Sequence, residues 1–430
     1  MFALHVYEAR RSRLKALMPE NSLALISAAH EVLRNRDTEY SFRQSSDFWY
    51  LTGFTEPNAV LLFGPGQPDR LFVRPKNPDQ EVWTGRRLGP NHVKSQLGIE
   101  EGLSLDMLES ELNLLLADIS WIEYPFFCPH STKLVDQAMN ASGSGRRRQN
   151  SLFHRVDLSR NLHPARMIKS GEERDVMREA GRISANGHVA AMQACKPGMT
   201  EDQLASFVEH QFRMEGAKAT AYQTIVGGGD NGCILHYVDR ADCLRSGDLV
   251  LIDAGCEIEG YAGDITRTFP VNGRFSSAQA ELYDLVLAAQ SEAIQAMRVG
   301  QSIKSFHEVA LQRLTEGLIE LKIISGPLDQ AMNDKSYLPF YMHGTGHFLG
   351  LDVHDVGAYQ TDGQPTELAE GMVITCEPGL YMGNQTATPE RYQGIGIRIE
   401  DDILITQQGP EILTAQAPKE RADIEALMRG

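Results

Sequence analysis

Residues 251–266 read LIDAGCEIEGYAGDIT, an apolar run that ends in one acid, Asp253, and is followed after a polar segment by another, Asp264. No Lys or Arg lies between the two acids. If the flanking apolar runs form a hairpin whose turn is centred between Ile258 and Glu259, the two acids lie directly opposite each other. Their side chains would then be about 5 Å apart, an arrangement that destabilises a strand pair when the charges are alike. The stretch therefore predicts a positive charge held between two carboxylates.

Two further acids end strand-like runs nearer the C-terminus. Glu377 closes MVITCE and Glu400 closes GIGIRIE. Alternation along the second run places Arg398 on the same face as Glu400. Four carboxylates at one place raise one another's pKa, so such a cluster requires cations. We therefore expect each half of this region to contribute a strand pair bearing two acids to one cation site.

Histidine is the remaining ligand type. The segment HGTGHFLGLDVHD supplies His343, His347 and His354, without the Glu of the zinc-protease motif H-E-x-x-H, and its glycines favour a loop over a helix. A histidine alone is more often a structural residue, but three within twelve residues beside an acid cluster favour metal ligation. Four carboxylates and one imidazole balance two divalent cations, and oxygen-rich ligands suit Mn²⁺. Two such ions about 3.5–4 Å apart hold a bridging hydroxide and polarise a carbonyl, which is the chemistry of a hydrolase.

The 430 residues are enough for two or three domains. The first 120 or so mix apolar runs (59–63 and 71–74) with helix-like stretches, one at the N-terminus and one over 101–118, which indicates an α/β domain. Beyond residue 165 the pattern changes to that of a second domain, so we expect domains over 1–165 and 166–430.

Three capping-box signatures start helices in the second domain: Ser170 with Glu173, Thr200 with Gln203, and Ser276 with Gln279. The first two helices precede the strand-like runs QTIVGG, DLVLIDAG and GDITRTFPV. The third helix and another over 303–321 precede GMVITCEP and GIGIRIEDDILIT. Helices followed by antiparallel strands, twice over, predict an internally duplicated α+β domain.

Composition excludes several classes of function. The net charge of −16 argues against nucleic acid or an anionic membrane surface as the main partner. No apolar run approaches the roughly 18 residues of a membrane helix. Six cysteines without a C-x-x-C pair indicate reduced thiols, so we expect a cytoplasmic protein. The basic stretch ASGSGRRRQNS, residues 141–151, is interpreted as an exposed loop.

At its acids and histidines the sequence resembles the pita-bread metallopeptidases, which include aminopeptidase P, prolidase and methionine aminopeptidase. The resemblance lies in LIDAGCEIEGYAGDITRTFPVNG, MHGTGHFLGLDVHDVG, ITCEPGLY and GIGIRIEDDI, which carry the family's five ligand types in order. SFRQSSDFWYLTGFTEPNAVLLF and EVWTGRRLG look like the leading domain of aminopeptidase P. The resemblance covers essentially the whole chain. It implies a pita-bread catalytic domain behind an N-terminal α/β domain.

The resemblance also implies a metal-ligand set. Asp253 would hold one ion, Asp264 and Glu400 would bridge both, and His347 and Glu377 would complete the other. Mn²⁺ is the expected metal, with Zn²⁺ and Co²⁺ as alternatives. The implied reaction is release of the N-terminal residue from peptides whose second residue is proline, with a metal-bridging hydroxide as the nucleophile.

Further roles follow from the same resemblance. Glu377 would carry a proton to the leaving nitrogen, and the catalytic histidines would be His236 (in GCILHY), His343 and His354. Tyr381 and Arg398 would bind substrate, although Arg398 could instead form a structural ion pair and Tyr381 could be a core residue. Trp83 and Arg148 match positions that reach a neighbouring subunit's active site, which implies a homo-oligomer, a dimer or tetramer.

Two alternatives remain open. Prolidase, which cleaves Xaa-Pro dipeptides, has the same catalytic motifs, and EVWTGRRLG (81–89) favours aminopeptidase P over it. A non-catalytic peptide-binding relative predicts loss of at least one of the five ligands, and none is substituted here.

Overall fold

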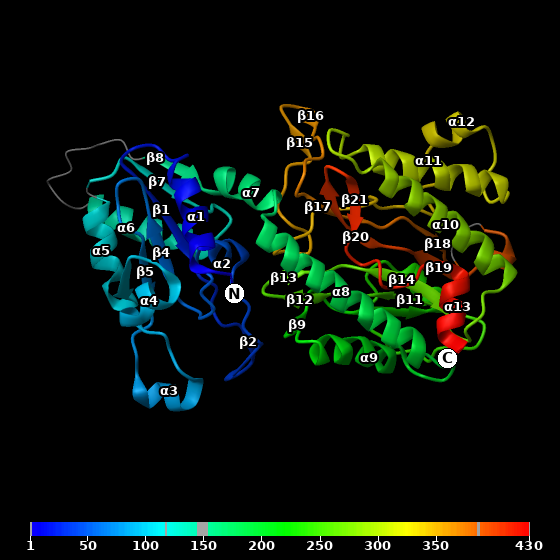
Figure 1. The fold of residues 1–430 in the computed structure, drawn as a ribbon, viewed down its shortest axis with the longest axis horizontal. Helices are drawn as coiled ribbons and strands as arrows, with labels where there is room; N and C mark the ends of the chain where they lie inside the picture. The colour runs from blue at the N-terminus through cyan, green and yellow to red at the C-terminus, as the bar shows by residue number, and fades with distance from the viewer. Residues whose placement is uncertain (1, 117, 144–153, 385–387, 430) are drawn as a thin grey trace. The chain divides into compact units, whose positions relative to one another are not determined.

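The computed structural model describes residues 2–116, 118–143, 154–384 and 388–429. They divide into two units, Met1–Ala165 and Arg166–Gly430 (Figure 1). The mixed helix and strand content agrees with the α+β class expected from the sequence.

The N-terminal unit is built on one mixed sheet with the strand order β6-β5-β4-β1-β7-β8. These strands are β1 (Ser22–Ser27), β4 (Val60–Phe63), β5 (Arg70–Val73), β6 (Glu101–Ser104), β7 (Trp121–Tyr124) and β8 (His154–Asp157). Apolar side chains of β1, β4 and β7 on one face form a core with α5 (Leu108–Leu115) and α6 (Pro129–Gly143). The strands expected near 59–63 and 71–74 and the N-terminal helix are confirmed.

Smaller elements complete this unit. They are α1 (Leu4–Lys15), α2 (Ser46–Thr52), α3 (Pro78–Thr84), α4 (Val93–Leu97), β2 (Leu33–Asn35), β3 (Thr38–Glu39), and the 3₁₀ turns Pro90–His92 and Leu105–Met107. The basic stretch 141–151 lies outside the described residues beyond Gly143, where α6 ends.

The helix expected over 101–118 is wrong in its first part. Glu101–Ser104 is the edge strand β6, which pairs in parallel with β5, and Glu101 forms an ion pair with Arg70 at 2.8 Å. The Ser104 hydroxyl then accepts a hydrogen bond from the backbone N–H of Asp106, which starts the turn into α5. Strand pairing in the folded sheet thus outweighs a helical periodicity of the sequence.

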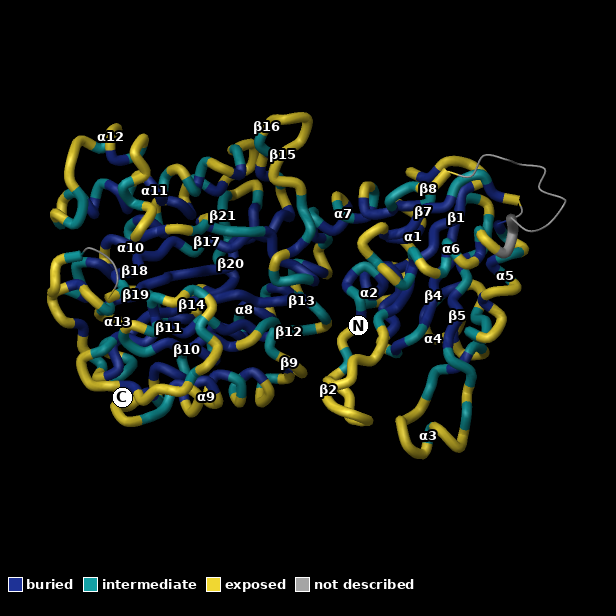
Figure 2. The backbone as a smooth tube through the Cα atoms, turned by 180° about the vertical axis from the view of Figure 1, so that it is seen from behind, coloured by how far each residue is buried: buried dark blue, intermediate teal, exposed yellow. Residues whose placement is uncertain are grey.

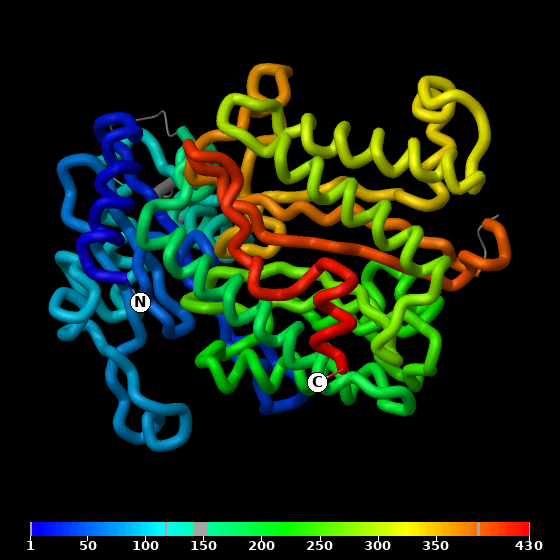
Figure 3. The backbone as a smooth tube through the Cα atoms, turned by 45° about the vertical axis from the view of Figure 1, so that its right-hand side comes forward, coloured from blue at the N-terminus to red at the C-terminus, as the bar shows by residue number. Residues whose placement is uncertain are grey.

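The C-terminal unit contains two successive sets of helices and strands. The helices are α8 (Gly171–Ala194), α9 (Glu201–Met214), α10 (Ser277–Ala296), α11 (Ser305–Glu320), α12 (Leu328–Asn333) and α13 (Arg421–Arg429), with α7 (Ser159–Met167) preceding them. The long helices pack as pairs, α8 with α9 and α10 with α11 (Figure 3). All three predicted capping boxes are present, with both of their hydrogen bonds, at Ser170, Thr200 and Ser276.

The strands of this unit are largely buried, whereas its outer turns are exposed (Figure 2). They are β9 (Ala219–Thr220), β10 (Ile225–Gly228), β11 (Leu249–Asp253), β12 (Cys256–Ile258), β13 (Tyr261–Ala262), β14 (Thr266–Pro270), β15 (Gln360–Thr361), β16 (Gln364–Pro365), β17 (Val373–Cys376), β18 (Gly379–Met382), β19 (Ile395–Arg398), β20 (Asp401–Thr406) and β21 (Gly409–Ile412). The 3₁₀ turns are Gly229–Cys233 and Glu390–Tyr392.

The expected hairpin forms, but its predicted register is wrong. Asp253 is paired with Thr266, not with Asp264. The turn is centred one residue later, at Glu259 and Gly260, whose φ angles of 49° and 83° are both positive. Two positive φ values are the signature of the tight hairpin turn that matches strand twist, and glycine accepts such values without strain. Asp264 therefore lies two residues before the partner of Asp253, on the same face and diagonal to it.

Among the described residues, none of the helices combines the length and the apolar character that crossing a bilayer requires. All six cysteines are free.

Candidate metal centre

The predicted acids and one predicted histidine converge in the C-terminal unit. Within the described residues, one group of three or more side chains is arranged to share a metal ion, and it consists of Asp264, His347 and Glu400, whose ligand atoms all lie within 4.8 Å of one another. His347 Nε2 lies 3.4 Å from Asp264 Oδ2 and 3.7 Å from Glu377 Oε1. Asp253 lies beside this group, because the hydroxyl of Tyr222 contacts both Asp253 and Asp264.

Two hairpins place the acids. Asp253 ends β11 and Asp264 precedes β14, while Glu377 follows β17 and Glu400 precedes β20. The register of β17 with β20, extended by one residue, puts Glu377 opposite Glu400. The backbone N–H of Glu400 donates to the carbonyl of Thr266, so the hairpins of the two halves meet where their acids lie.

The orientation of His347 is fixed by its neighbours. Its backbone N–H donates to Thr375 Oγ1 at 3.1 Å, and its carbonyl accepts from the Thr375 N–H at 2.9 Å. Its ring Nδ1 lies 3.0 Å from the carbonyl of Phe348. A carbonyl holds the proton on Nδ1, which leaves Nε2 directed at the acids, as in histidines that bind metals.

Burial and mutual repulsion shift the acids of this site. Burial raises the pKa of Asp253 and raises the pKa of Glu377 to about 7. It also raises the pKa of Glu400 well above its usual range, with repulsion from Asp264 and Glu377 adding to the effect. For His347, burial lowers the pKa, but the hydrogen bond and charge of Asp264 outweigh burial and raise it to about 9. The raised pKa values therefore mean that the acids and His347 tend to keep protons as long as no cation is bound between them.

Arg398 supplies a positive charge beside Asp253, a contact that the predicted hairpin alone does not include. Arg398 Nη2 lies 2.6 Å from Asp253 Oδ2, and the arginine is 3% exposed. Its Nε donates to Thr266 Oγ1 at 3.0 Å, and that hydroxyl donates to Glu400 Oε2 at 2.6 Å. Arg398 also donates from Nη1 to the hydroxyl of Tyr381. Arg398 therefore forms an ion pair with Asp253, and its role in substrate binding stays a prediction.

The sequence reasoning missed Tyr222. Its hydroxyl lies 2.5 Å from Asp253 Oδ1 and 2.6 Å from Asp264 Oδ1, so its hydrogen is held between the two carboxylates. Tyr222 lies three residues before Ile225, the partner of Asp253 on β10. Tyr222 is close to Asp253 because β10 pairs with β11, and no motif in the sequence predicts this contact.

The predicted pocket residues surround the acid cluster. Burial lowers the pKa of His343 to about 4, and its neutral ring lies with Nδ1 2.7 Å from the carbonyl of Gly344 and Nε2 2.8 Å from the hydroxyl of Tyr381. The ring of His354 stands edge-to-face on that of His347, with centroids 4.3 Å apart. His236 is exposed, and its charge helps to lower the pKa values of His343 and His354, behind burial as the main cause. His236 is therefore close enough to His343 and His354 for its charge to affect both.

Two further predicted site residues, Trp83 and Arg148, precede the C-terminal unit in the chain. Trp83 belongs to α3 of the N-terminal unit and is 87% exposed. Arg148 lies outside the described residues.

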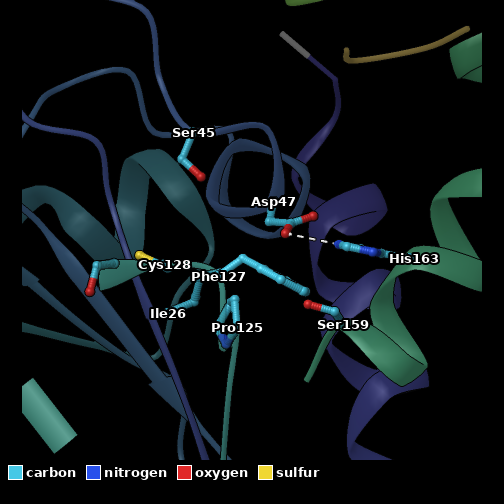
Figure 4. A pocket seen from close by; sticks show the side chains of 9 residues that line it. Ile26, Ser45, Asp47, Pro125, Phe127, Cys128, Ser159 and His163 are labelled. Carbon is cyan, nitrogen blue, oxygen red and sulfur yellow. Dashed lines mark hydrogen bonds and ion pairs between the residues drawn. The ribbon is translucent and has the colours of Figure 1, made fainter. Parts of the chain in front are cut away.

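The N-terminal unit has a cavity of its own, about 290 Å³ in volume, that contains none of the predicted site residues (Figure 4). His163 Nε2 and Asp47 Oδ2 approach to 3.3 Å at its wall. It is lined by Ile26, Ser27, Ser45, Asp47, Pro125, Phe127, Cys128, Ser159 and His163.

Comparison with known proteins gives consistent matches over the whole chain. The family model of metallopeptidase family M24 matches residues 175–407, and that of the aminopeptidase P N-terminal domain matches residues 7–121. The Xaa-Pro aminopeptidase of Escherichia coli K12 is 44% identical over 98% of this chain and 97% of its own.

Two solved structures have the same fold throughout. Aminopeptidase PepP of Pseudomonas aeruginosa superposes with a TM-score of 0.98 at 41% identity, covering 100% of this chain and 98% of its own. Aminopeptidase P from Escherichia coli with the inhibitor Pro-Leu gives 0.97 at 43% identity, with the same coverage. The expected combination of a pita-bread domain with an aminopeptidase P type leading domain is confirmed.

Proposed function

The chain belongs to metallopeptidase family M24, a family of hydrolases, and on that premise we propose that it is an Xaa-Pro aminopeptidase. It would release the N-terminal residue from peptides whose second residue is proline. The observation that carries this proposal is the convergence of Asp264, His347 and Glu400, with Asp253 and Glu377 beside them, in a chain 44% identical to a protein of that activity.

The donor set fits divalent metal. Burial and, in addition, repulsion from neighbouring acids raise the pKa values of Asp253, Glu377 and Glu400, and a bound cation would offset both effects. We assign Asp253 to one ion, Asp264 and Glu400 to a bridge between two, and His347 and Glu377 to the other. The oxygen-rich set favours Mn²⁺, with Zn²⁺ and Co²⁺ as alternatives. When bound, the ions would supply a nucleophilic hydroxide and polarise the scissile carbonyl.

The side chains around this site have defined tasks in the proposed reaction. Glu377, which lies beside the proposed position of the hydroxide, would accept its proton and pass it to the leaving imino nitrogen. A histidine that is neutral, as His343 is, can hydrogen-bond substrate without adding charge. His354, whose ring stacks edge-to-face on that of His347, and His236 would stabilise charge that develops on the carbonyl oxygen. Because an Xaa-Pro bond has no N–H, a wall of rings can select proline without a partner for that group.

Three proposals concern the whole protein. The two functional domains are 1–165 and 166–430. Trp83 and Arg148 would contribute to the active site of a neighbouring subunit, which makes the protein a homo-oligomer, a dimer or tetramer. We propose the cytoplasm as its compartment.

The deciding experiment offers the Mn²⁺-loaded protein a matched pair of substrates, an Xaa-Pro dipeptide and an Xaa-Pro-Xaa tripeptide. Release of the first residue from the tripeptide supports the aminopeptidase. Activity confined to the dipeptide would replace it with prolidase, and tripeptide binding without turnover would indicate a non-catalytic relative.

A variant tests the metal assignment. Asp264→Ala removes the proposed bridge, so bound metal and turnover should both fall to background. Full turnover in this variant would rule out the two-metal site.

A further inference from the structure

A buried glutamate outside the metal centre collects hydrogen bonds from the loop between β10 and β11. Glu201, the first residue of α9, has no exposed surface. Its Oε1 accepts from the Gly228 backbone N–H at 2.8 Å and from Asn231 Nδ2 at 3.0 Å. Its Oε2 accepts from the Tyr237 hydroxyl at 3.0 Å and from the Asp242 backbone N–H at 3.0 Å. One carboxylate therefore ties the end of β10 to three points of the loop, at Asn231, Tyr237 and Asp242.

This role is separate from capping α9. Thr200 and Gln203 form the capping box of that helix with both of its hydrogen bonds. Three of the four donors that reach the Glu201 carboxylate belong to the loop, and the fourth is the N–H of Gly228, the last residue of β10. The helix dipole alone can explain why an acid lies in the first turn of a helix. It does not explain why four donors from outside the helix converge on this carboxylate.

The loop that Glu201 holds carries His236. The neighbours of this histidine, Leu235 and Tyr237, pack against a buried cluster of Ile225, Leu251 and Tyr381. The backbone is therefore fixed on both sides of His236, while His236 itself remains exposed.

We infer that Glu201 is a positioning residue, which fixes His236 in the substrate-binding wall by anchoring its loop to α9. The inference rests on the proposed function, in which His236 contacts substrate. The position requires a carboxylate because four donors converge on two oxygens. Glutamine keeps the shape but turns an NH₂ group toward donors on one side, so at least one pair of contacts is lost.

A double-mutant cycle tests whether Glu201 acts through His236. The rate constant kcat/KM on an Xaa-Pro-Xaa tripeptide is measured for the wild type, Glu201→Gln, His236→Ala and the double variant, all loaded with Mn²⁺. We expect Glu201→Gln to lower kcat/KM by up to about 100-fold, the effect of misplacing a substrate contact by about 1 Å. In the His236→Ala background it should cause no further fall, because the group that it positions is gone. Bound metal should be unchanged throughout.

Glu173→Gln is the matched control. Glu173 is also a buried glutamate in the first turn of a helix, and it accepts from the Tyr261 hydroxyl at 2.7 Å and from the Ser170 backbone N–H at 2.9 Å. It should leave kcat/KM within about twofold of the wild type. If Glu201→Gln does not fold, Tyr237→Phe removes one donor from the same carboxylate and should show the same dependence on His236, with a smaller effect.

Equal losses in both backgrounds would show a general structural role and overturn the inference, as would an unchanged kcat/KM in Glu201→Gln. A second readout does not depend on turnover. The ring NMR signals of His236, assigned by their loss in His236→Ala, should shift in Glu201→Gln and stay in place in Glu173→Gln. Unshifted signals would overturn the positioning role, whereas a wild type inactive on every Xaa-Pro peptide would instead overturn the proposed function.

Discussion

Stripping the protein of metal with a chelator and then adding Mn²⁺ at pH 7 should release about two protons for each active site filled. Metal ligands bind in their deprotonated forms, so every proton that the metal-free cluster holds must leave. His347, with its pKa near 9, carries about one proton at pH 7, and Glu377, with its pKa near 7, carries about half. Glu400, whose pKa is raised well above its usual range, adds up to one more. The expected count is therefore about 1.5 to 2.5 protons.

The same shifts fix the sign of the pH dependence. Between 4.5, the ordinary pKa of a glutamate, and about 7, folded Glu377 binds more protons than it does in the unfolded chain. The free energy of unfolding of the metal-free protein therefore falls as pH rises through this window, by about 3 kcal/mol from Glu377 alone. His347 acts in the same direction between 6.5 and about 9, because its folded pKa is also raised. Added metal should accordingly stabilise the protein more at pH 8 than at pH 5.

Isothermal titration calorimetry at pH 7 measures the proton count. The observed heat is plotted against the ionisation enthalpy of several buffers, and the slope is the number of protons released. Glu173→Gln, which lies outside the metal centre, should give the same slope. A slope near zero would mean that the ligands are already deprotonated, and it would refute the charge argument for this cluster.

Three further substitutions test separate parts of the structure. Arg267→Leu removes a partner of the fully buried Asp401, 2.7 Å away, and should lower the free energy of unfolding in urea by about 3–5 kcal/mol; a loss below about 1 kcal/mol would contradict this. Gly255→Ala puts a Cβ 1.7 Å from the Gly263 carbonyl oxygen, so the thermal midpoint should drop by several degrees, and an unchanged midpoint would be unexpected. Tyr222→Phe removes the hydroxyl shared by two acids and should cost about 10- to 100-fold in Mn²⁺ affinity, measured by calorimetry; wild-type affinity would deny it that role.

Local signals in the sequence predicted much of the fold. The helices that begin after Ser170, Thr200 and Ser276 could be placed because each start depends on two side chains three residues apart. The edge strand at Glu101–Ser104 could not, because its strand state depends on pairing with a neighbour distant in the sequence. The hairpin register was predicted one residue too early, because Gly260, which adopts a positive φ, sets the position of the turn.

In the site, too, the residues that local sequence signals indicate could be predicted, and those that depend on distant contacts could not. The acids and His347 could be proposed because each stands at the end of an apolar run or inside a motif. Tyr222 and Glu201 could not, because their partners are defined by how strands and a loop meet in space. Arg398 was placed on the correct face by alternation, but its ion pair with Asp253 joins the two halves of the unit and depends on how they pack.

The shifted register bears on the proposal that the site would hold two ions. Directly opposite carboxylates about 5 Å apart would converge on one position, whereas diagonal neighbours are about 7–8 Å apart at their backbones. The diagonal arrangement lets Asp264 reach His347, at 3.4 Å, while Asp253 turns toward Arg398 and the shared hydroxyl of Tyr222. Only Asp264 of this pair belongs to the group with His347 and Glu400 that can share one ion. The separate side-chain partners of Asp253 and Asp264 therefore support the proposal of two ions, with Asp264 as the shared ligand, over a single ion held by all the acids.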